Sequence, residues 1–424
     1  MPFSVFADES GSTHVFPAYN LEEFTIIVLP DTQFYSQSYP EIFDCQVQWI
    51  LDNLEPLNII FVSHLGDLVD VWSDEYAWEN ANHSMSMLDG AVPWAVLPGN
   101  HDGVSVSGDL RYYEQFFGIE RFQNYSWYGG AYQNDNANSY QLFSGGGDDY
   151  LIFHLQYDPS DAVLLWADKV IDKYPDRRVI VSTHEYMGAH FFPSLTLEIG
   201  ETIWNKLVKL NGDQIFLVLC GHLSLEQQRT DTTVDGYNIY QMVSDYQDRE
   251  NGGDGWLRIL TFSPLQEKIF VKTYSPYLDE YEQDANSEFV LDYNMTSNQE
   301  YVSIQSNSEL SGFCFGKSEQ KISFVASGAT GTSGYCTVSV PKTLVDADSW
   351  TVNVATNNID YTVSSNSSHS LIHFSYTNSE FLQVSVVPNA SLNLVLPLFV
   401  LLLCLVACVL VFRKKLLVLV GKRV

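Results

Sequence analysis

Residues 22–295 show two alternating patterns of hydrophobic and polar positions. Short runs rich in β-branched and aromatic residues predict strands: "EFTIIVLP", "LNIIFVSHLG", "VPWAVLPG", "YLIFHLQY", "RRVIVSTH" and "DQIFLVLCG". Amphipathic stretches lie between them and predict helices at residues 40–54, 161–174 and 201–210. Strands that are apolar on both faces and alternate with helices indicate a sheet covered on both sides. The fold class predicted for residues 22–295 is therefore α/β.

The pattern changes after residue 300. Between residues 301 and 388 the hydrophobic runs are closely spaced and separated by Gly, Ser and Asn, with no helical periodicity: "KISFVASG", "GYCTVSV", "SWTVNVAT", "HSLIHFSY" and "FLQVSVV". Such spacing predicts a small all-β sandwich domain. We expect this domain to act as a spacer.

Residues 394–412 carry no charge and are long enough to cross ~30 Å of hydrocarbon as a helix. Basic residues crowd the following segment, 413–424, which predicts a cytoplasmic tail and places the preceding domains on the exterior side of a cell membrane. A cleaved sorting tail is the alternative. Residues 1–21 form an N-terminal segment in which Val5 and Ala7 match a signal-peptidase site, so it is interpreted as a possible remnant of a signal peptide.

Composition narrows the range of partners. The formal net charge of −31 excludes binding to a nucleic-acid backbone, because little in the chain could neutralise phosphates in bulk. An oxidising exterior would permit Cys314 and Cys336, both in the strand-rich region, to form a disulfide.

Polar side chains follow several of the predicted strands directly. They occur in "LPDTQ", "HLGDLVD", "LPGNHD", "VSTHE" and "LCGHLS" and include Asp31, Gln33, Asp67, Asn100, His184 and His222. Ligands collect at the carboxyl ends of strands in an open α/β sheet, so these side chains are expected to converge. Each motif alone also fits a turn or a core histidine, but their ordered recurrence at one structural position favours a shared site.

As a set, these motifs resemble those of the calcineurin-like metallophosphoesterases over residues 22–275. The resemblance implies a metallophosphoesterase βαβ sandwich with two divalent metal ions, drawn from Mn, Fe, Zn, Mg and Ca. It further implies that Asp67 bridges the metals, that Asp31 and Gln33 serve the first metal, and that Asn100, His184 and His222 serve the second. His101 would face the substrate as the general acid, with Asp70 behind it.

The chain departs from the family pattern at two positions. Gln33 stands where the family has His, and Ser224 replaces the second His of the last motif. The first site would then hold oxygen ligands only, with Ser224 as a possible weak ligand, and oxygen ligands suit Mn²⁺, Mg²⁺ or Ca²⁺ better than Zn²⁺. We therefore expect two unequal sites, the first being the weaker.

The function predicted is hydrolysis of phosphate mono- or diesters by a metal-activated water, carried out by a membrane-anchored exterior enzyme on a small phosphate-ester substrate. Possible substrate contacts are Arg111, Tyr246 and Gln247, which lie in long polar and aromatic segments after two of the motifs. The alternative is a surface binding or adhesion protein that keeps the phosphoesterase fold with a degenerate metal site, as Ser224 would allow.

Overall fold

The computed structural model describes residues 11–18, 21–104, 108–187, 198–295, 300–316 and 319–389. The chain divides into two compact units, one formed by Asn20–Asn298 and the other by Met1–Tyr19 together with Gln299–Val424. We call them the α/β unit and the two-sheet unit, and each is described by itself.

The α/β unit contains two seven-stranded sheets. One has the order β14-β13-β12-β2-β3-β4, with β15 added to β13, and the other has the order β10-β11-β9-β8-β7-β6-β5. The strands of the first sheet are β2 (Phe24–Leu29), β3 (Ile59–His64), β4 (Trp94–Ala95), β12 (Leu257–Ser263), β13 (Lys268–Ser275), β14 (Glu280–Glu282) and β15 (Phe289–Asp292). Those of the second are β5 (Tyr128–Tyr132), β6 (Asp135–Gly145), β7 (Asp148–Leu155), β8 (Arg178–Thr183), β9 (Ile215–Cys220), β10 (Glu226–Thr232) and β11 (Asn238–Ser244).

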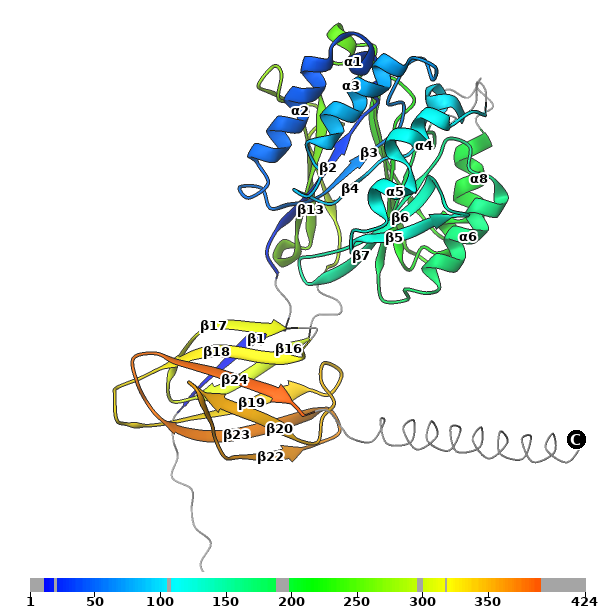
Figure 1. The fold of residues 1–424 in the computed structure, drawn as a ribbon. Coiled ribbons are helices and arrows are strands. Elements are labelled where there is room, and N and C mark those ends of the chain that lie inside the picture. The colour runs from blue at the N-terminus through cyan, green and yellow to red at the C-terminus, as the bar shows by residue number, and fades with distance from the viewer. Residues whose placement is uncertain are drawn as a thin grey trace, which may run out of the picture. The chain divides into compact units, whose positions relative to one another are not determined.

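Helices cover the outer faces of both sheets, with α2 and α3 on one side and α6 and α8 on the other (Figure 1). The helices are α1 (Gln33–Ser38), α2 (Pro40–Asp52), α3 (Glu75–Ser86), α4 (Arg111–Phe117), α5 (Ile119–Phe122), α6 (Asp161–Ile171) and α8 (Glu198–Lys206). Short helical turns are η1 (Asn100–Val104), η2 (Val208–Leu210), η3 (Glu250–Gly252) and η4 (Pro264–Gln266).

Local signals in the sequence explain where the main helices begin. Pro40 occupies the first turn of α2, where its missing N–H costs no hydrogen bond. The Asp74 carboxylate accepts from two backbone N–H groups at the start of α3, and the Ser160 hydroxyl accepts from one at the start of α6.

The predicted strands are present as β2, β3, β4, β7, β8 and β9, but they belong to two sheets rather than one. The inner faces of the sheets pack on each other: Phe24, Ile26 and Phe61 share a cluster with Tyr150 and Ile152. A strand buried by a helix on one face and by a second sheet on the other has the same continuous hydrophobic run as a strand between two helix layers. The hydrophobic pattern therefore could not distinguish one sheet from two.

The two-sheet unit contains two five-stranded sheets, ordered β1-β16-β19-β23-β22 and β17-β18-β24-β20-β21. Side chains from both sheets share one hydrophobic cluster, which includes Val338, Ile372, Phe324 and Trp350. The strands are β1 (Ser12–Pro17), β16 (Tyr301–Ser306), β17 (Glu309–Gly316), β18 (Lys321–Ser327), β19 (Ser333–Pro341), β20 (Trp350–Val354), β21 (Asn357–Asn358), β22 (Tyr361–Ser365), β23 (His369–Thr377) and β24 (Leu382–Pro388).

Two sequence interpretations change in this unit. The sequence predicts a separate segment at residues 1–21, whereas Ser12–Pro17 pairs with β16 along its whole length. The disulfide that an oxidising exterior would permit is not formed: Cys314 is exposed on β17, Cys336 is buried on β19 in the other sheet, and both are free thiols.

The membrane segment predicted at residues 394–412 and the basic tail at 413–424 lie outside the described residues. Within the described part of the chain, no helix is long and apolar enough to cross a membrane.

Candidate metal centre

The predicted ligands follow the carboxyl ends of strands from both sheets of the α/β unit. Asp31, Asp67 and Asn100 come after β2, β3 and β4, whereas His184 and His222 come after β8 and β9. Asp67 and His222 have φ angles of 50° and 72°, in the left-handed region that non-glycine residues rarely adopt. Backbone strain of this kind is concentrated at functional sites, because the surrounding structure must hold it in place.

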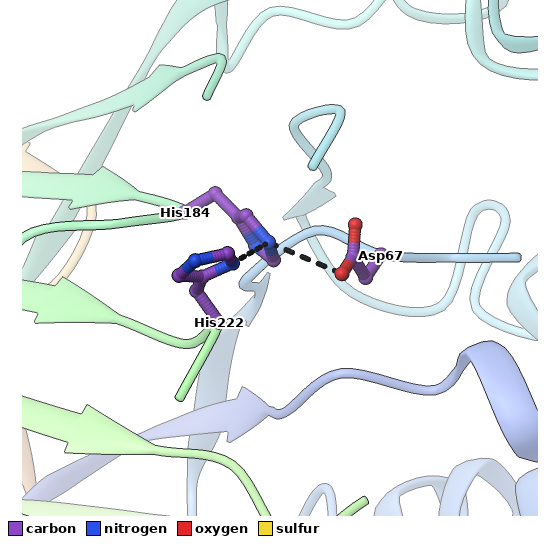
Figure 2. A group of neighbouring side chains, drawn as sticks. All are labelled: Asp67, His184 and His222. Atoms are coloured by element: carbon purple, nitrogen blue, oxygen red, sulfur yellow. Dashed lines mark hydrogen bonds and ion pairs between the residues drawn. The ribbon is translucent and has the colours of Figure 1, made fainter. Parts of the chain in front are cut away.

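The structure brings most of these side chains together. The atoms that Asp67, His184 and His222 could offer to a metal ion lie within 4.8 Å of one another (Figure 2). His184 Nε2 is 3.2 Å from Asp67 Oδ2, and His222 Nδ1 is 3.3 Å from His184 Nε2. Asn100 Oδ1 lies between the rings, 2.9 Å from His184 Nε2 and 2.8 Å from His222 Nδ1.

The second predicted site fits a metal because its lone pairs face one another. His184 Nδ1 lies 2.8 Å from the Leu65 carbonyl, which can only accept, so Nδ1 carries the hydrogen. Nε2 of the neutral ring then faces two oxygens, on Asp67 and Asn100. Burial lowers the pKa of His184, but the Asp67 carboxylate, the Leu65 carbonyl and the charge of Asp102 together hold that pKa above the ordinary value. The position therefore favours a cation, either a proton or a metal ion.

The first predicted site contains Asp31 and Gln33, which are 1% and 2% exposed. Asp31 accepts from the backbone N–H of His222, at 3.1 Å, and Gln33 Oε1 has no hydrogen-bond partner among the described residues. Burial, followed by the charges of Asp245 and Asp67, raises the pKa of Asp31 well above its ordinary value. Buried carboxylates that repel one another, and a buried amide oxygen without a partner, are ligands that suit a hard cation.

Two glycines permit this close packing. A Cβ atom at Gly99 would overlap Asp67 Oδ1, and one at Gly221 would overlap Asp31 Oδ1. Each carboxylate therefore rests against backbone that has no side chain, which explains Gly in "PGNHD" and "CGHLS".

His101 and Asp70 form the predicted pair at the edge of the site. His101 Nδ1 is 2.8 Å from the backbone oxygen of Asp70 and 3.3 Å from its Oδ1, while the backbone N–H of His101 donates to Asp67 Oδ1 at 2.9 Å. The imidazole is 39% exposed. Because Nδ1 is held by Asp70, Nε2 is the atom that can act on a substrate.

The remaining predicted residues do not join the cluster. Tyr246 is 1% exposed and its hydroxyl donates to Glu226, so it does not contact substrate; its side chain packs inside the unit. The Gln247 amide donates to Asp245 at 3.0 Å. Arg111 pairs with Asp109, the ordinary salt bridge of an exposed arginine. The hydroxyl of Ser224, the possible weak ligand, accepts a hydrogen bond from the backbone N–H of Asp248 at 3.0 Å.

Sequence reasoning missed several buried acids at the centre. Asp102 accepts backbone N–H groups from Leu68, Val69 and Gly99 and so ties the Asp67 loop to the Asn100 loop. Asp245 is 1% exposed and follows β11; burial raises its pKa to about 7. Glu185 is also 1% exposed. The signal that identified the other residues, a polar residue directly after a hydrophobic strand, also applied to Asp245.

Comparisons with known proteins agree with this geometry. Residues 24–225 match the family model described as calcineurin-like phosphoesterase. An uncharacterized protein of Bacillus subtilis, YvnB, is 39% identical over 264 residues, which are 61% of this chain and 20% of that protein. A probable glycerophosphodiester phosphodiesterase, GpdQ, of Arcobacter nitrofigilis is 25% identical over 188 residues, 41% of this chain and 59% of that protein.

Among solved structures, purple acid phosphatase PPD1 from yellow lupin superposes with a TM-score of 0.42 at 12% identity, covering 66% of this chain and 55% of that one. The chain spans less than two thirds of the length of each of these three relatives.

Proposed function

We propose that the chain is a metal-dependent phosphoesterase that hydrolyses phosphate mono- or diesters. The observation that carries this proposal is the convergence of Asp67, His184, His222 and Asn100, with their lone pairs directed at one another. The calcineurin-like phosphoesterase match over residues 24–225 supports it.

The bound ions and three residues of the chain would each have a role in the hydrolysis. When bound, the two ions would neutralise phosphoryl charge and supply a water-derived nucleophile. Asp67 Oδ2 lies 3.2 Å from His184 Nε2 on the second side, and its charge acts on Asp31 on the first side, as expected for a shared ligand. His101 would protonate the departing oxygen through Nε2, while Asp70 holds the ring by Nδ1.

A panel of esters tests the proposal. Purified protein with Mn²⁺ is expected to hydrolyse p-nitrophenyl phosphate, its bis ester or a glycerophosphodiester, the last because GpdQ is named for that activity. Asp67→Ala should reduce hydrolysis to background and EDTA should abolish it, whereas Asp52→Asn, an exposed carboxylate on α2, should leave it unchanged. If wild type and Asp67→Ala were equally inert with every metal and ester, the binding-protein alternative would replace the enzyme.

We further propose that the two metal sites differ in affinity. The Asp31 and Gln33 side offers oxygen ligands, whereas the other side offers two imidazoles, which hold transition metals more tightly. Dialysis without chelator should therefore remove one equivalent readily and keep the other. Retention of both equivalents to the same extent, measured by elemental analysis, would contradict this order.

We also propose that the enzyme is anchored in a cell membrane by residues 394–412 with its catalytic domain on the exterior side. The uncharged run and the basic residues after it support this topology. Protease digestion of intact cells should remove the α/β unit from the surface; full protection in intact cells, with digestion only after lysis, would argue against it.

A further inference from the structure

Glu185 is a buried carboxyl that the proposed chemistry does not use. It follows the metal-ligand candidate His184 and is 1% exposed, and neither carboxylate oxygen has a hydrogen-bond partner among the described residues. Burial raises the pKa of the Glu185 carboxyl, and the nearby Tyr157 hydroxyl opposes that rise. A buried carboxylate without a strong partner is costly, so its presence requires an explanation.

The ring of His222 faces the Glu185 carboxyl group. Nε2 of His222 lies 3.4 Å from Glu185 Oε2, while Nδ1 of the same ring points to the metal centre, 2.8 Å from Asn100 Oδ1. For Nδ1 to offer a lone pair to a metal, the hydrogen of the neutral ring must be on Nε2. Glu185 is placed to accept that hydrogen.

His184 provides a comparison within the same site. Its outer nitrogen is held by the backbone carbonyl of Leu65, which fixes the ring and its tautomer. At His222 the corresponding partner is a side chain, and a carboxylate additionally raises the basicity of the ligand nitrogen. Tyr157 supports this arrangement: its ring contacts both imidazoles, and its backbone N–H donates to Pro98 at 3.0 Å.

We propose that Glu185 is a positioning residue for His222: it accepts the Nε2 hydrogen, so that Nδ1 binds the metal. This inference rests on the proposed metal centre. It assigns the glutamate of "THE" to the neighbouring strand's histidine rather than to His184, to which it is adjacent in sequence.

Metal binding by the full chain in mild detergent tests the inference without relying on activity. Mn²⁺ and Zn²⁺ affinities are measured by equilibrium dialysis for wild type, Glu185→Leu, Glu185→Gln and a matched control, Asp158→Asn, which removes an exposed charge near Glu185. Glu185→Leu should weaken one of the two equivalents ~10- to 100-fold, as loss of an outer-shell carboxylate typically does. Glu185→Gln should lose less, because its amide oxygen can still accept, and Asp158→Asn should match wild type.

The same measurements in a His222→Ala background show whether Glu185 acts through His222. There the Glu185 substitutions should cause no further loss, because the ring they position is gone. Equal losses in both backgrounds, or wild-type affinity in Glu185→Leu and Glu185→Gln, would overturn the inference. If Glu185→Leu does not unfold cooperatively on heating, and so is not folded, the metal affinities of Glu185→Gln in the two backgrounds decide instead. Wild type that binds neither ion would overturn the proposed function instead.

Discussion

The orientation of single side chains determines what the centre can do, and His101 is the clearest case. Its Nδ1 is held by Asp70 and its ring is 39% exposed, so Nε2 is the atom that would donate a proton in the proposed reaction. Because His101 is not among the predicted ligands, His101→Gln should keep both metal equivalents and lose ~10²- to 10⁴-fold in kcat with an alkyl phosphodiester. With p-nitrophenyl esters the loss should be small, since that leaving group needs no proton.

Steady-state kinetics on both ester types, with elemental analysis of bound metal, check this prediction. His83→Gln is the control, because His83 is an exposed imidazole paired with Asp44 on the surface. Equal losses on both ester types would mean that His101 acts on something other than the leaving group.

At the residue scale, the sequence identified the parts of the site that follow from strand ends. Asp31, Asp67, Asn100, His184 and His222 each follow a hydrophobic run. The structure brings the side chains of Asp67, Asn100, His184 and His222 together, and Asp31 accepts from the backbone N–H of His222. The sequence could not identify Glu185 as part of the site, because Glu185 and His222 follow different strands and meet only through a tertiary contact. Tyr246 was misjudged because an aromatic residue in a polar loop reads as exposed, whereas this one is buried against Glu226.

At the scale of elements, the sequence predicted where strands and helices lie, but it did not predict which sheet each strand joins. Alternation along β9 illustrates the reason: Leu217 and Leu219 face the other sheet, whereas Val218 and Cys220 face helices. All four are apolar, so the sequence contains no signal for which face meets which layer. The antiparallel strands β12 and β13 were likewise missed, and they complete the sheet that carries Asp31 and Asp67.

A carboxyl pair joins α4 to β6 and gives a pH prediction. Burial, followed by a hydrogen bond with Asp135, raises the pKa of Glu114 from 4.5 to about 8. The folded state thus holds a proton that the unfolded state releases above pH ~4.5, so this group's stabilising effect falls as pH rises from there to about 8. Glu114→Gln keeps the neutral shape and should melt at a higher temperature than wild type above pH 8, with little difference near pH 4.

Thermal melts across this pH range check the prediction, with Glu120→Gln, an exposed glutamate on α5, as the control. Curves for wild type and Glu114→Gln that stay parallel from acid to alkaline pH would show that Glu114 is ionised in the folded protein.

At the scale of the whole molecule, the chain order makes the two-sheet unit discontinuous. Its β1 strand precedes the α/β unit in sequence and its other strands follow it, so Asn20–Asn298 is inserted between β1 and β16. In sequence order residues 1–21 stand far from the strand-rich region after residue 300, so the sequence alone predicts a separate N-terminal segment. Only the pairing of Ser12 with Ser306 and of Pro17 with Tyr301 shows where the strand belongs.

This insertion predicts that a substitution near the N-terminus will destabilise the two-sheet unit and leave catalysis unchanged. Phe16 is half-buried and stacks on Phe313 with ring centroids 4.6 Å apart, whereas Val15 is 62% exposed on the same strand. Phe16→Ala should lower the free energy of unfolding of the two-sheet unit by ~1–3 kcal/mol, less than the ~3–5 kcal/mol of a fully buried Phe. Val15→Ala should change it by less than ~0.5 kcal/mol.

Calorimetry with and without Mn²⁺ assigns the transitions, because a ligand stabilises only the unit that binds it, by ~2.7 kcal/mol at a hundredfold excess over Kd. The transition that shifts with Mn²⁺ belongs to the α/β unit, which contains the candidate ligands. Phe16→Ala should move the other transition, and hydrolysis should match wild type. If it moved the Mn²⁺-responsive transition instead, β1 would support the catalytic unit, and the assignment of the N-terminal strand to the two-sheet unit would be wrong.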